Sequence, residues 1–283
     1  MNKNNLKLEL NIEVLGSAGA FDFGETSASF LINYTQEDKN YNFLVDCGHN
    51  VLKKLKDKGY MKSHKSIDGV FITHMHFDHI ADLEGLIYYN YFVLGKSTNV
   101  YVPDYLKEDY NKIFDGKFNY IDEYGNKTWV PMVYVHDLSL TSYDELIPFV
   151  EFREDKDQWD WDKLLLTTRV FKANHGNYKA FGFLFGLSSV VSKKILISGD
   201  SKANFEILKL VKKLIDVQNT KEIVIFHDYS NWDDPIRNIH CCETDFNLVY
   251  KELFDIDKPY YNKLTWYKYH NNENVGKVEF IRT

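Results

Sequence analysis

Short apolar runs that end in a polar residue recur along the chain. Each run has the length of a buried strand. Five of them lead directly into a residue able to bind a metal or a substrate, namely Asp46, His74, Asp200, His227 and His270. Because the sites of α/β folds lie at the carboxyl ends of strands, this pattern predicts one site built from several strand ends.

The same pattern predicts the order of strands and helices. We expect strands over 8–15, 28–34, 41–46, 69–73, 166–172, 180–187, 194–199, 222–227 and 264–269. We expect helices over 51–58, 83–92, 205–217 and 245–253. Asn204 and Thr244 are the expected N-caps of the last two helices. This order favours two βαβ-like halves.

The length favours one large layered domain. The chain has 283 residues and no Pro/Gly/Ser-rich linker, so we expect one domain over 1–283. The segment 99–165 fits least well, because it has few clean periods and many aromatic residues, and we interpret it as an insertion. Its rings either extend the core or a homodimer interface, or cover the active site and stack on a flat group of a substrate.

The charge balance changes the range of expected partners. The formal net charge is -7, and the basic clusters at 53–58 and 209–213 are modest. A protein that grips a long nucleic acid usually carries a basic stripe or arm, so a large polyanion is disfavoured. The three cysteines form no disulfide framework, and the chain has no apolar run of about 18 residues and no signal-peptide core. We expect a cytoplasmic protein without a membrane partner, acting in the host cytoplasm if a phage encodes it.

Metal-binding side chains crowd into six residues, with His74, His76, Asp78 and His79 at the end of an apolar run. Such groups are costly to place at a strand end unless something binds them. Imidazole and carboxylate together suit zinc, manganese or iron(II). In an extended segment His74, His76 and Asp78 share one side, while Asp78 and His79 can serve a second point beyond it. The run can therefore begin two neighbouring metal sites.

The order of these groups resembles the metallo-β-lactamase superfamily. Residues 74–79 have its HxHxDH form, and a distant His175, Asp200 and His270 follow in order. The motifs at 15–19, 45–48 and 198–201 are similar to those of the ribonuclease Z-like phosphodiesterase branch. The similarity covers about residues 10–272. It implies an α/β fold, the αββα metallo-β-lactamase sandwich.

The resemblance also implies a ligand set for two divalent metal ions, with zinc favoured and manganese as the alternative. His74, His76 and His175 would hold one ion. Asp78, His79 and His270 would hold the other, with Asp200 as the bridge. His240 falls where the branch has a histidine that assists the leaving group, and His227-Asp228 stands where it has His-Glu. The family commonly has small hydroxyl residues after that first histidine, and here they are Cys241 and Cys242.

The implied activity is a two-metal phosphodiesterase. Two ions lower the pKa of a shared water, and the resulting hydroxide attacks phosphorus. Asp78 would orient the hydroxide and His240 would act as general acid. The acidic balance, and the lack of a Gly/Pro-rich arm for holding transfer RNA, favour a small-molecule phosphodiester and above all a cyclic nucleotide.

Other interpretations stay open. The alternatives are ribonuclease Z-like processing of transfer-RNA 3′ ends, hydrolysis of a lactone, thioester or β-lactam, and a non-catalytic sensor or structural subunit. Asp46 is expected to fix a histidine tautomer rather than bind a metal. We expect His49 and His64 to be exposed. His136 is expected to cap a strand or pair with Asp137, and the alternative is that it approaches the pocket from the inserted segment. His227 is expected to have a structural role, although it competes with His270 as a ligand.

Overall fold

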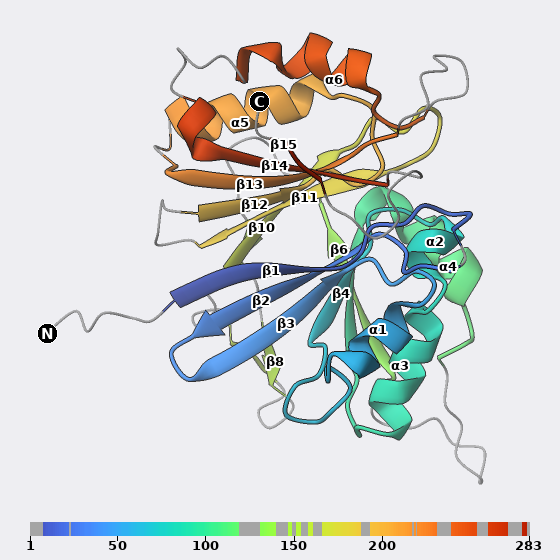
Figure 1. Cartoon of the computed structure of the whole chain (residues 1–283). Helices are drawn as coiled ribbons and strands as arrows, with labels where there is room; N and C mark the ends of the chain where they lie inside the picture. Colours follow the sequence, from blue (N-terminus) through green and yellow to red (C-terminus); the bar gives the residue numbers. More distant parts are fainter. Residues whose placement is uncertain are drawn as a thin grey trace, which may run out of the picture.

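Two β-sheets pack face to face, and helices cover both outer sides (Figure 1). The structure is a computed structural model. It describes residues 8–22, 24–118, 131–139, 147–148, 151–153, 158–160, 166–187, 193–216, 218, 220–230, 239–253, 260–270 and 279–281. The layers follow the order helix, sheet, sheet, helix, so the αββα sandwich expected from the sequence is confirmed.

The first sheet contains six strands among the described residues, in the order β1-β2-β3-β4-β5-β6. The strands are β1 (Leu8–Gly16), β2 (Ser29–Gln36), β3 (Lys39–Val45), β4 (Gly69–Phe71), β5 (Thr98–Pro103) and β6 (Val133–Leu138). β1, β2 and β3 form an antiparallel meander, and β3 to β6 run parallel. Only the later part of this half is therefore βαβ-like.

The second sheet repeats this plan. Its order is β15-β14-β13-β12-β11-β10-β7 among the described residues. The strands are β7 (Ile147–Pro148), β10 (Leu166–Lys172), β11 (Phe181–Leu187), β12 (Lys193–Ile197), β13 (Glu222–Asp228), β14 (Leu264–Tyr269) and β15 (Glu279–Ile281). β10 to β12 are antiparallel, and β12 to β14 are parallel. A separate ribbon pairs β8 (Glu151–Arg153) with β9 (Gln158–Asp160).

The helices that cover the outer faces bury apolar side chains against the sheets. The helices are α1 (Val51–Asp57), α2 (Phe77–Ile80), α3 (Leu83–Phe92), α4 (Lys107–Phe114), α5 (Phe205–Asp216) and α6 (Glu243–Tyr250), with short 3-10 turns η1 (Asp104–Leu106), η2 (Lys251–Leu253) and η3 (Tyr261–Lys263). Asn204 caps α5, since its Oδ1 accepts from the Glu206 amide at 2.9 Å. The Thr244 cap is wrong, because α6 begins at Glu243 with Cys242 in the cap position.

The main core joins the two sheets. Phe71 of β4 packs against Phe183 and Phe185 of β11, with ring centroids 5.3 and 5.1 Å apart. A second apolar cluster lies between the outer face of the second sheet and helices α5 and α6. Burial of this apolar area is the main favourable term in holding the layers together. The assignment of the chain to a single domain stays a prediction.

The aromatic-rich segment 99–165 divides into parts with different surroundings. Its beginning supplies β5, η1 and α4, and residues 133–138 supply β6 of the first sheet. Tyr101, Tyr110 and Phe114 are buried in the core, while Tyr105 is exposed. For these three rings the interpretation as core is confirmed. Several of the other aromatic residues lie outside the described residues, including Tyr120, Tyr124, Trp129, Tyr143, Phe149 and Trp161.

Candidate metal centre

The candidate site lies where strands of both sheets end (Figure 1). Asp46 follows β3, His74 follows β4 and Asp200 follows β12. Asp228 ends β13, and His270 follows β14. Four of the five predicted strand-end residues gather here, whereas the fifth, His227, is replaced by its neighbour Asp228.

The first group of candidate ligands is His74, His76 and His175, whose ligand atoms all lie within 4.8 Å of one another. His74 Nε2 and His76 Nδ1 are 3.0 Å apart. His175 reaches them from the turn after β10 and is buried, as is His74. Burial lowers the pKa of both His74 and His175. This favours the neutral imidazole, the form that binds a metal.

The second group is Asp78, His79, Asp200 and His270, whose ligand atoms again all lie within 4.8 Å of one another. Asp78 and His79 do not continue an extended segment, because the chain turns into α2 at Phe77. The expectation that His74, His76 and Asp78 share one side of a strand is therefore wrong. The helical turn is what directs Asp78 and His79 towards the second group and away from the first.

A third group shares two members with the second: Asp200 and His270 are joined by Asp228 and His240. His240 Nδ1 donates to Asp228 Oδ2 at 2.7 Å, and the His240 side chain is 26% exposed. Asp228 is completely buried and also accepts from the Ser201 amide at 2.8 Å. The sequence interpretation gave Asp228 no role. Adjacent residues of a strand point to opposite faces, so only one residue of the pair His227-Asp228 can face the site.

His227 lies on the face of β13 that points away from the candidate site. It packs against Phe246, Tyr250 and Trp266 in the outer core, and its Nε2 accepts from the Tyr250 hydroxyl at 3.0 Å. It belongs to none of the three groups. The structural role expected for His227 is thus the one the geometry supports, and His270 takes the place near the other ligands.

Asp46 contacts the site indirectly. Its carboxylate accepts from the Thr73 amide at 2.8 Å, from the Thr73 hydroxyl at 2.6 Å and from His79 Nδ1 at 2.8 Å. Asp46 itself has a positive φ of 61°. These bonds fix the His79 ring and its tautomer, as expected from the sequence.

Three buried histidines share one arrangement of their two ring nitrogens. Nδ1 faces a fixed acceptor in each case: Asp46 at 2.8 Å for His79, the Ile239 carbonyl at 3.3 Å for His175, and Asp228 at 3.2 Å for His270. The Nε2 atom of each is buried without a hydrogen-bond partner, and so is Asp200 Oδ1. Buried polar atoms are normally paired. Unpaired nitrogens that are oriented through the other ring atom fit a bound metal ion.

The electrostatics of the site also favour a cation. Four buried carboxylates lie together in the protein interior, those of Asp46, Asp78, Asp200 and Asp228. Burial alone would lower the pKa of His270, but Asp200 and Asp228 outweigh it and raise that pKa to about 10. Without a metal, protons on the histidines must balance the carboxylates. Divalent ions can replace those protons at neutral pH.

The other histidines lie apart from the three groups. His64 is exposed, as expected. His49 is only partly exposed, because its Nδ1 lies 2.6 Å from Ser27 Oγ and its Nε2 3.1 Å from the Asp22 carbonyl. His136 lies within β6, where its Nε2 is 2.9 Å from Asn99 Oδ1 and its ring stacks on Tyr101. The expected pair with Asp137 stays a prediction.

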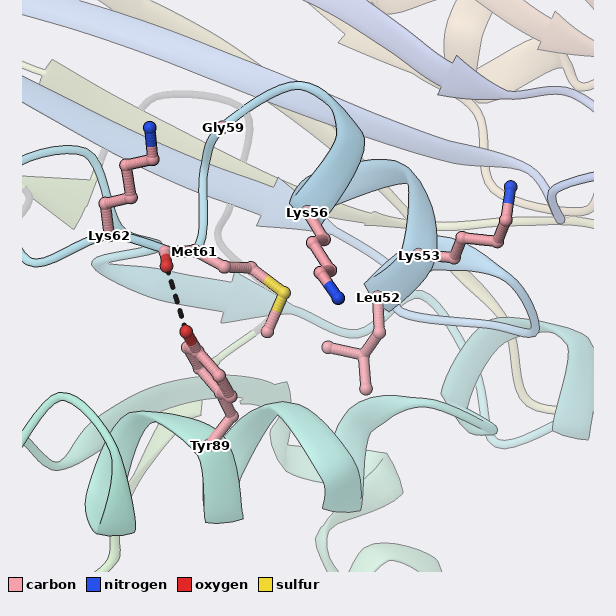
Figure 2. A pocket seen from close by; sticks show the side chains of 7 residues that line it. All are labelled: Leu52, Lys53, Lys56, Gly59, Met61, Lys62 and Tyr89. Atoms are coloured by element: carbon pink, nitrogen blue, oxygen red, sulfur yellow. Dashed lines mark hydrogen bonds between the residues drawn. The ribbon is translucent and has the colours of Figure 1, made fainter.

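A groove of about 750 Å³ lies on another part of the surface, between α1 and α3 (Figure 2). Figure 2 shows Lys53, Lys56 and Lys62 around an apolar floor, where the Tyr89 hydroxyl donates to the Met61 carbonyl at 3.0 Å. None of its lining residues belongs to the three groups of candidate ligands.

No helix among the described residues is long and apolar enough to cross a membrane.

Comparison with known proteins identifies the family. The family model described as Anti-Pycsar protein Apyc1 matches residues 10–282. The chain belongs to this family. The Apyc1 protein of Bacillus phage vB_BsuM-Goe3 is 39% identical over 113 residues, which are 39% of this chain and 42% of the relative. The matches span less than half the length of the first curated Apyc1 relatives.

Solved structures share the fold of this Apyc1-family chain. The metallo-β-lactamase fold protein YhfI from Bacillus subtilis has a TM-score of 0.61 and 18% identity, over 93% of this chain and 86% of its own. The short form of human tRNase Z has a TM-score of 0.58 and 19% identity, over 92% of both chains. These likenesses show that the chain has the metallo-β-lactamase fold. The ribonuclease Z-like branch and the metal-dependent hydrolase activity stay predictions at this point.

The loop after β3 gives a test of how the site is positioned. Cys47 and His79 are joined by a backbone hydrogen bond of 2.8 Å, and a Cβ added to Gly48 would lie 1.6 Å from the Asp78 carbonyl oxygen. We predict that Gly48→Ala displaces Asp78 and lowers both metal content and thermal stability. Elemental analysis and thermal unfolding measure these effects. Gly24→Ala, where the nearest atom to the added Cβ is 4.0 Å away, is the matched control and should leave both unchanged.

Proposed function

We propose that the chain is a two-metal phosphodiesterase that hydrolyses a small phosphodiester, above all a cyclic nucleotide. The observation that carries this proposal is the position of Asp200. Its Oδ2 lies 3.7 Å from His74 Nε2 in the first group, and its Oδ1 lies 3.4 Å from His79 Nε2 in the second. One carboxylate thus faces both groups with different oxygens, which is the geometry required of a bridge.

The proposed metal assignment follows the groups. His74, His76 and His175 would hold one divalent ion, and Asp78, His79 and His270 the second, with Asp200 between them. The mixture of imidazole and carboxylate suits zinc and, as the alternative, manganese. When bound, such a pair supplies an activated water and neutralises charge on the phosphate. Asp78 would orient the attacking water as well as bind an ion.

His240 is the proposed general acid. It lies at the exposed edge of the third group, where a leaving oxygen can approach it, and Asp228 fixes its ring through Nδ1. Burial alone would lower the pKa of His240, but Asp228 and Asp200 raise it. The protonated ring can then donate a proton to the departing oxygen at neutral pH.

Two further observations favour a cyclic nucleotide over a long nucleic acid. The formal net charge of -7 gives little attraction to a polyanion, whereas a cyclic diester carries a single charge. The family model and the relatives carry the name Anti-Pycsar protein Apyc1. Four of these relatives come from Bacillus phages, so we infer that this chain acts in the cytoplasm of an infected cell.

The bridge can be tested by removing it. We predict that purified protein holds about two transition-metal ions per chain, and that Asp200→Ala loses metal and activity together because the carboxylate serves both ions. Elemental analysis and turnover are the two measurements. Asp57→Ala, at an exposed carboxylate of α1, should change neither. Full metal content and turnover in Asp200→Ala would contradict the assignment.

The role of His240 can be separated from metal binding. We predict that His240→Ala keeps its metal but hydrolyses a cyclic nucleotide about 10²–10⁴-fold more slowly, the usual effect of losing a general acid. A p-nitrophenyl diester should recover much of this loss, because p-nitrophenolate leaves without a proton. Equal losses on both substrates would show that His240 acts on the structure of the site instead.

A substrate screen tests the activity itself. Metal-loaded protein should hydrolyse cyclic mononucleotides in preference to a transfer-RNA precursor, a lactone or a chromogenic β-lactam. Its affinity should depend weakly on salt, with a log–log slope of about -1 or smaller, because the substrate has few charges. Efficient cleavage of the transfer-RNA precursor with cyclic mononucleotides left intact would instead favour the ribonuclease Z activity.

A further inference from the structure

One exposed aromatic ring touches the candidate metal centre. The Tyr178 side chain is 55% exposed, yet its ring centroid lies 4.7 Å from that of His76 and 5.6 Å from that of His175. Aromatic side chains normally bury most of their area. A ring left this open beside a site therefore has surface available for a ligand.

The backbone that carries this ring forms a tight turn. The Tyr178 amide donates to the His175 carbonyl at 3.1 Å, which closes a tight turn over residues 175–178. Gly176 supplies the positive φ of 60° that the turn requires. The ring planes of Tyr178 and His76 cross at 73°, so this contact is edge to face rather than a parallel stack. The backbone of Tyr178 is thus held beside the metal centre by the same turn that presents His175.

The position of Tyr178 relative to His240 is what a nucleotide requires. The His175 ring is a common neighbour of both, since its centroid lies 5.6 Å from that of Tyr178 and 5.4 Å from that of His240. In a cyclic nucleotide the oxygen that leaves phosphorus belongs to the sugar, and the base is attached to that same sugar. A base should therefore lie one sugar away from His240, on the part of the site that holds His175 and Tyr178.

Other exposed aromatic side chains fit this role less well. Phe77 is 46% exposed, but its ring stacks on His49, which belongs to none of the ligand groups. Tyr105 is 60% exposed and stacks on Phe181 of β11. Tyr178 is distinguished from both because its described ring contacts are with candidate metal ligands.

We infer that Tyr178 is a substrate-binding residue whose ring stacks on the base of the nucleotide. This inference rests on the proposed function and extends it, since it assigns the base-binding contact to the turn after β10 rather than to the segment 99–165. Stacking on an aromatic ring gives affinity through the face of the base. The contribution should therefore appear in substrate binding and not in the chemical step.

The test compares four variants of the metal-loaded, full-length protein. Tyr178→Ala and Tyr178→Leu remove the ring, Tyr178→Phe keeps it, and Phe92→Ala removes an equally exposed ring (58%) at the end of α3. Calorimetry measures the Kd of a cyclic nucleotide phosphorothioate that resists hydrolysis. Turnover is measured on a cyclic mononucleotide and on the cyclic phosphate of 1,3-propanediol, which has no base.

We expect Tyr178→Ala and Tyr178→Leu to weaken phosphorothioate binding by about 5- to 150-fold, the usual effect of losing one stacking ring. Tyr178→Phe and Phe92→Ala should bind like wild type. Phe92→Ala should keep its metal and hydrolyse both substrates at the wild-type rate. Tyr178→Ala and Tyr178→Leu should lose more on the cyclic mononucleotide than on the base-free diester. Wild-type Kd in Tyr178→Ala, or an equal loss on the base-free diester, would overturn the inference. Failure of the wild type itself to bind or hydrolyse any cyclic nucleotide would instead overturn the proposed function.

Discussion

The arrangement of this site depends on a single constraint, the burial of four carboxylates among histidines in the interior of the protein. Like charges that lie close together repel strongly when water is excluded. The repulsion is balanced only if cations lie between the carboxylates, whether protons on imidazole or metal ions. Asp200 shows this most directly, because it is 2% exposed, has one unpaired buried oxygen and faces His74 and His79 from its two sides.

The fold meets this constraint by orienting several histidines of the site through a hydrogen bond to the ring nitrogen Nδ1. Asp46 orients His79, Asp228 orients His240 and contacts His270, and the Ile239 carbonyl orients His175. These partners come from strand ends and loops of both sheets, so the geometry of the site depends on the packing between the sheets. The contact between Phe71 and the β11 aromatics is part of that packing. A site of this kind can be rigid before any ligand arrives.

The regular features of the chain were predictable because they are local. The strand at 166–172 and the helix at 83–92 have the bounds expected from their apolar patterns. The cap at Asn204 follows from one side chain and the next turn of backbone. Prediction was wrong where the backbone changes direction within a few residues. At Phe77 the chain leaves the extended conformation for α2, and periodicity contains no signal for such a short helix.

The sequence by itself determined the types of ligand and their order, since apolar runs ending in histidine or aspartate are readable without coordinates. The family resemblance added how those ligands divide between two ions. Only the tertiary structure decided which neighbours matter. Asp228 faces the site while His227 faces the outer core, because adjacent strand residues point apart and only packing determines which side is which. Tyr178 lies beside His76 although about a hundred residues separate them, and that contact exists only because the two sheets meet at one edge.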